Sequence, residues 1–135
     1  MKKVILLCAL ALFFVSFTIT VHAAVPVKID VLYMNHGPLQ DTLNKMKTIF
    51  SGYNTKLTVS WHDFESPDGE KFMASKGIKQ HVPLVIWIDG NPKAALGAKE
   101  VTFAGFPTGS GPAFFQGKWT MDDLKAALDQ STAKR

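Results

Sequence analysis

Beyond its first 23 residues, this sequence could do chemistry mainly through histidine. His36 opens the stretch His36-Gly37-Pro38-Leu39, which follows an apolar run, and His62 and His81 come later in the chain. Imidazole takes part in acid–base chemistry and is a common ligand of zinc and copper. The only cysteine, Cys8, lies near the N-terminus. Disulfide exchange needs a thiolate and a second thiol, so the rest of the chain cannot carry it out.

The first 23 residues have the pattern of a secretory signal peptide. Two lysines at positions 2 and 3 precede an almost unbroken apolar run at 4–21, and small residues end it at Ala23. We expect residues 1–23 to be removed, leaving 24–135 as one domain in the periplasm or outside the cell. The alternative is an uncleaved anchor, because the apolar run approaches the ~20 residues that span a bilayer. Contact with a membrane is expected only in that case.

The charge balance argues against nucleic acid as a partner. The formal net charge is +4, and two of these charges belong to Lys2 and Lys3 in the predicted signal peptide. A nucleic-acid-binding domain is expected to carry a clustered basic surface. The mature chain would also contain no cysteine, so its stability must come from an ordinary hydrophobic core.

Four segments have the composition of β-strands. Residues 27–34 and 84–88 are rich in apolar and β-branched side chains, which is typical of buried strands. Residues 56–64 alternate, with Leu57, Val59 and Trp61 on one face. Residues 100–106 predict a last strand, and the short connection before it indicates antiparallel pairing with 84–88.

Three segments predict helices. Apolar residues recur at helical spacing from Asp41 to Gly52, and a short helix is expected at 70–75. The last helix follows Thr120, which can cap it. Between them, residues 107–117 are rich in glycine and proline and predict a loop.

The order of these elements, together with two short motifs, resembles the thioredoxin-like family. Gly37-Pro38 follows the first strand, and Val82-Pro83 precedes the third. Aligned on that family, His36 and Leu39 occupy the positions of the two redox cysteines, and Val82-Pro83 falls on the cis-proline motif. The resemblance covers about residues 27–129. It implies an α/β fold, a three-layer α/β/α domain with a central mixed sheet, and a cis peptide bond before Pro83.

The resemblance also implies a binding function without catalysis. Without the two cysteines, we expect no thiol–disulfide oxidoreductase activity, and we expect no cofactor. In relatives, a groove beside the cis-proline binds an extended protein or peptide segment through main-chain hydrogen bonds. We therefore predict a redox-inactive protein that binds such a partner. The residues expected to form the groove are His36, Gly37, Pro38, Leu39, Val82 and Pro83.

Two adjacent aromatic residues are further candidates for partner contact. Phe114 and Phe115 lie in the glycine-rich loop, and neighbouring residues cannot easily both point inward. Exposed aromatic side chains are typical anchors of protein interfaces.

A metal site is the alternative function. If the inferred fold holds, His36, His62 and His81 all lie near one edge of the sheet, the edge where open α/β sheets bind ligands. Three imidazoles with an open fourth position would suit zinc or copper. The histidines are not spaced as in a known metal motif. An ordinary solvated or hydrogen-bonded role is the competing interpretation.

Overall fold

The computed structural model describes residues 23–135. Apart from Ala23, the predicted signal peptide lies outside this range, so its cleavage stays a prediction. Within the described range, no helix is long and apolar enough to cross a membrane.

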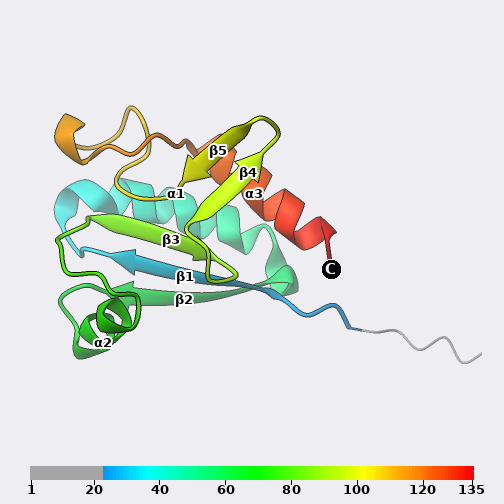
Figure 1. Ribbon diagram of the computed structural model, residues 1–135, viewed down its shortest axis with the longest axis horizontal. Coiled ribbons are helices and arrows are strands. Elements are labelled where there is room, and N and C mark those ends of the chain that lie inside the picture. The colour runs from blue at the N-terminus through cyan, green and yellow to red at the C-terminus, as the bar shows by residue number, and fades with distance from the viewer. Residues whose placement is uncertain (1–22) are drawn as a thin grey trace, which may run out of the picture.

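The protein is a mixed α/β structure built on a three-stranded mixed sheet (Figure 1). β1 (Val27–Tyr33) lies in the middle, between β2 (Leu57–Asp63) and β3 (Leu84–Ile88). β1 runs parallel to β2, with Ile29 opposite Val59, and antiparallel to β3, with Ile29 opposite Ile88. The three strands predicted at 27–34, 56–64 and 84–88 are therefore confirmed.

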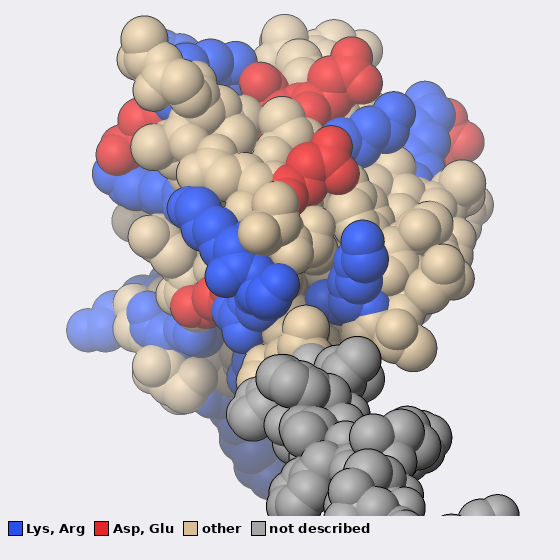
Figure 2. Space-filling view, turned by 90° about the vertical axis from the view of Figure 1, so that its right-hand side faces the viewer, with Lys and Arg blue, Asp and Glu red and all other residues tan. Residues whose placement is uncertain are grey.

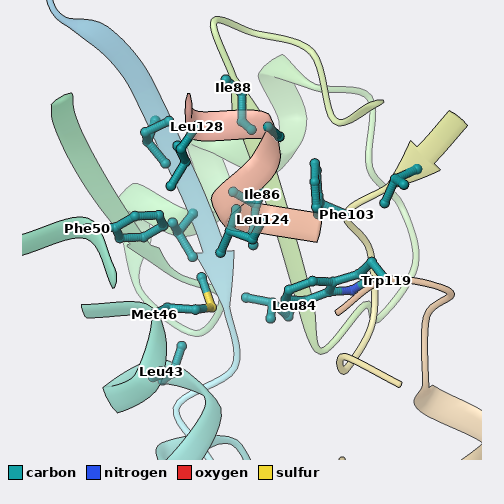
Figure 3. Packing of buried hydrophobic residues seen from close by; sticks show 14 of the residues in the cluster. Leu43, Met46, Phe50, Leu84, Ile86, Ile88, Phe103, Trp119, Leu124 and Leu128 are labelled. Carbon is teal, nitrogen blue, oxygen red and sulfur yellow. The ribbon is translucent and has the colours of Figure 1, made fainter. Parts of the chain in front are cut away.

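Helices cover both faces of this sheet (Figure 1). α1 (Gln40–Ser51) and α3 (Met121–Ala133) pack on one face, where their apolar side chains join those of β1 and β3 in the larger core. Figure 3 shows Met46 and Phe50 of α1 and Leu124 of α3 within this core. Strand side chains alternate between faces, so the opposite face of the sheet packs on α2 (Pro67–Ser75) in a second, smaller core.

The helix boundaries follow from local capping. Ser66 accepts a hydrogen bond from the Gly69 amide at 2.9 Å, and Pro67 occupies the first turn of α2. This helix therefore begins three residues before the predicted start at Glu70, because proline is well accommodated in a first turn. The predicted cap of the last helix is confirmed, since Thr120 and Asp123 form a reciprocal capping box at the start of α3.

The strand predicted at 100–106 is corrected. A separate two-stranded sheet forms from β4 (Lys93–Leu96) and β5 (Lys99–Thr102), which pair antiparallel. Only the segment after β5 runs beside β3, through a bridge between Val85 and Ala104. The regular strand ends at Thr102, and Gly105 with φ +76° turns the chain away. The expected pairing with β3 is therefore limited to these few residues.

Basic and acidic side chains are interspersed at the end of the molecule where the C-terminus lies (Figure 2). Two lysines of the β4–β5 sheet form ion pairs, Lys99 with Asp123 at 3.0 Å and Lys93 with Glu100 at 3.1 Å. These pairs compensate part of the positive charge of the β4–β5 sheet.

Candidate functional site

An apolar groove lies at the end of the molecule where β1 finishes, opposite the C-terminus (Figure 1). Its volume is about 310 Å³. Its walls come from the end of β1, the turn before α1, the start of β3 and the loop that follows β5. The lining residues are Met34, His36, Pro38, Leu39, Pro83, Phe106, Pro112 and Phe115. His36 alone among these eight has an ionisable side chain.

The turn His36-Gly37-Pro38-Leu39 forms the first wall through a short 3-10 helix, η1 (Gly37–Leu39). His36 is extended, and its carbonyl accepts a hydrogen bond from the Leu39 amide at 3.0 Å. Pro38 suits the first turn of this helix, because its fixed φ is compatible with helical backbone. Leu39 is buried to 1% exposure and packs into the larger core. Leu39, which occupies the position of the second redox cysteine in the resemblance, therefore anchors this turn to the hydrophobic core.

The opposite wall is a loop held by backbone hydrogen bonds. The Phe106 amide donates to the Phe115 carbonyl at 2.9 Å, and the Gly117 amide donates to the Phe106 carbonyl at 2.7 Å. The buried indole of Trp119 donates to the Gly105 carbonyl at 3.1 Å. These bonds fix Phe106 and Phe115 where both side chains face the groove.

Phe114 and Phe115 form an aromatic pair at the rim, in the 3-10 helix η3 (Ala113–Phe115). Their exposed fractions are 81% and 39%, and their ring centroids lie 4.2 Å apart. The prediction that the two side chains do not both point inward is confirmed. Phe115 lines the groove, whereas Phe114 is in solvent beside it.

The expectation of a cis bond before Pro83 is wrong. The described residues contain no cis peptide bond. Trans is the lower-energy isomer even before proline, and in this arrangement the Pro83 carbonyl accepts a hydrogen bond from the Met34 amide at 3.0 Å. The trans Pro83 is buried and still lines the groove.

The other predicted groove residues divide into two groups. His36, Pro38 and Leu39 line the groove together with Pro83. Gly37 and Val82 do not line it, and Val82 packs instead against the smaller core on the α2 side.

Sequence reasoning missed three lining residues, which are Met34, Phe106 and Pro112. Phe106 is buried to 4% exposure in the larger core, yet it also lines the groove. The signal that could have predicted Phe106 and Pro112 as lining residues is their position next to and within the glycine-rich loop.

The three histidines are not brought together. His36 Nε2 lies 3.4 Å from a carboxylate oxygen of Glu65. His81 lies against Phe64, with ring centroids 4.5 Å apart. His62 stacks on Phe72 of α2 at a centroid distance of 3.8 Å.

His62 is already engaged at both ring nitrogens. Nδ1 lies 2.8 Å from Asp68, and Nε2 lies 3.4 Å from the buried carboxylate of Asp30. Within residues 23–135 no group of three or more His, Cys, Asp or Glu side chains is arranged to hold a metal ion. Binding of copper or zinc by these histidines stays a prediction that this arrangement does not support.

No family model matches this sequence, and no curated protein matches it either. Function therefore has to be inferred from the groove itself.

Proposed function

We propose that this chain is an exported, redox-inactive thioredoxin-like protein that binds an extended segment of a protein partner in the apolar groove. The order of strands and helices, with helices on both faces of a mixed sheet, supports a thioredoxin-like three-layer α/β/α assignment. The positions of Gly37-Pro38 after β1 and of Pro83 before β3 support it further.

The groove carries the proposal. It collects His36, Pro38, Leu39, Pro83 and Phe115 from three separate parts of the chain into one hollow. Exposed apolar surface costs about 25 cal/mol per Å² relative to burial. A persistent apolar hollow beside an 81% exposed phenylalanine is therefore best explained by a partner that covers both.

The chemistry of the lining favours a protein segment over a small polar substrate. Sites for small molecules combine apolar walls with several placed polar groups that fix the orientation of the ligand. Here His36 is the one ionisable side chain in the lining. An apolar side chain of a bound protein segment needs no such groups in the groove, because hydrogen bonds to the main chain of that segment can fix its orientation at the rim.

Thiol chemistry has no place in this proposal. Leu39 has no reactive group and is buried, and His36 cannot form a mixed disulfide. The protein acts by holding its partner, and no cofactor takes part.

Binding of selected peptides tests the proposal. The full chain would be expressed, and the protein purified as the cell processes it. Peptides selected from a random phage-displayed library would then be synthesised and their Kd measured by fluorescence anisotropy. Phe115→Ala is expected to weaken binding about tenfold or more, because full burial of a phenylalanine side chain is worth about 1.5–3 kcal/mol and about 1.4 kcal/mol corresponds to tenfold in Kd.

The matched control is Val25→Ala, which removes another exposed apolar side chain, 69% exposed, two residues before β1 and away from the groove. This variant is expected to bind like the parent. If Phe115→Ala and Val25→Ala both bind the selected peptides as the parent does, the groove is not the binding site.

A further inference from the structure

A second hollow lies beside the groove, between α2 and the segment that follows it. We call it the α2 hollow, and its volume is about 760 Å³. Three half-buried apolar side chains, Phe64, Met73 and Ile78, form its inner lining. The side chains of Glu65, Glu70, Lys79 and His81 are exposed and form its rim.

The groove and the α2 hollow meet at one contact. His36 lines the groove, Glu65 lines the α2 hollow, and His36 Nε2 lies 3.4 Å from Glu65 Oε1. A single extended segment that crosses this contact would therefore place side chains in both hollows.

The charges that line the α2 hollow favour a cation. Its lining holds two carboxylates, Glu65 and Glu70, and one ammonium group, Lys79, so its formal charge is negative. Ala74 and Gly77 at the C-terminal end of α2 also line it, and the helix dipole places partial negative charge at that end. Among the described residues, Glu70 has no ion-pair partner within 4.0 Å, so its charge is available to a ligand.

We propose that the bound segment carries a lysine or arginine that enters the α2 hollow, near the apolar side chain that enters the groove. The aliphatic stem of the basic residue would cover Phe64, Met73 and Ile78, while its charged head stays at the rim near Glu65 and Glu70. This inference rests on the proposed function and adds the partner's chemistry, which is an apolar residue followed or preceded closely by a basic one.

Two defined peptides test this inference. The probes are fluorescein-labelled Gly-Phe-Gly-Lys-Gly and Gly-Phe-Gly-Glu-Gly, in which one intervening residue places both side chains on the same face of an extended chain. The protein is the exported product of the full chain. The lysine peptide is expected to bind about threefold more tightly or better, and added salt should reduce this ratio because exposed charges are screened.

Variants assign the preference to the α2 hollow. Glu70→Gln is expected to reduce the ratio of the two Kd values towards one. Glu100→Gln is the matched control, because Glu100 pairs with Lys93 on the β4–β5 sheet, outside both hollows. It is expected to leave the ratio unchanged.

The outcomes separate the two proposals. Equal binding of both peptides, lost in Phe115→Ala, overturns the cation preference and leaves the groove in place. A ratio that Glu70→Gln and Glu100→Gln alter equally also overturns it. Failure of both peptides to bind, while the selected peptides still bind in the groove, overturns this inference alone; failure of the selected peptides as well overturns the proposed function.

Discussion

Gly105→Ala is expected to destabilise the protein by about 3–4 kcal/mol and to abolish peptide binding. Gly105 has φ +76°, a conformation that costs an L-residue about 1–2 kcal/mol. A Cβ at this position would lie 2.5 Å from the Phe115 carbonyl oxygen and 3.0 Å from the Gly117 amide nitrogen. Both are backbone atoms, so no side-chain rotation can relieve the contact.

The backbone must therefore separate at the wall of the groove. The hydrogen bonds from Phe106 to Phe115 and from Gly117 to Phe106 would be lost or stretched, at about 1 kcal/mol each. Together with the backbone conformation, this gives the expected total. Phe115 would move with its carbonyl, so the groove would lose one wall.

Gly109→Ala is the matched control for this prediction. Gly109 has φ +80° in the same loop, but a Cβ there would meet no atom within 4 Å. It should cost only the conformational term of about 1–2 kcal/mol. Urea unfolding followed by tryptophan fluorescence gives both free energies of unfolding. If the two variants are equally stable, the close approach of Gly105 to Phe115 does not hold the loop, and the reasoning is refuted.

Two further predictions concern the pH dependence of stability. Burial, followed by the hydrogen bond to Asp129 at 2.7 Å, raises the pKa of Tyr53 from 10.0 to about 12. Because the folded state holds this proton more tightly, the stabilisation is complete below pH 10 and is lost as the pH rises through about 12. Tyr53→Phe should flatten alkaline unfolding curves measured by circular dichroism, and an unchanged curve would contradict this. Burial alone would raise the pKa of Asp123, but hydrogen bonds from Lys99 and Thr120 outweigh it and hold the pKa below its ordinary value of 3.8. The resulting stabilisation is present above pH 3.8 and is lost as the pH falls through the lowered pKa, so Asp123→Asn should show less acid destabilisation than the parent between these values.

Hydrophobic patterning was sufficient for the central strands and the flanking helices. The run at Leu84–Ile88 is buried throughout because α1 and α3 cover one face and α2 covers the other. The β4–β5 hairpin was missed because Lys93–Leu96 is short and poor in β-branched residues, and only its pairing with Lys99–Thr102 makes it a strand.

The directions of the histidine side chains explain why the predicted metal site does not form among the described residues. Trp61 faces the larger core, so His62, one residue later in β2, faces α2, where it stacks on Phe72. The face on which His62 lies could be predicted from the sequence, because the alternation of strand side chains follows once the apolar face is assigned. The trans peptide bond before Pro83 could not be predicted, because proline permits both isomers and only the surrounding contacts select one.

The most direct test of the central claim is a two-dimensional proton–nitrogen NMR titration of the protein with a selected peptide. Binding in the groove predicts that amide shifts concentrate at Met34 to Leu39, around Phe106 and at Phe114 and Phe115. Residues at the far end, such as Lys99 of β5, should stay unchanged. Shifts confined to the exposed edge of β2, or spread evenly over the molecule, would contradict the assignment of the groove as the binding site.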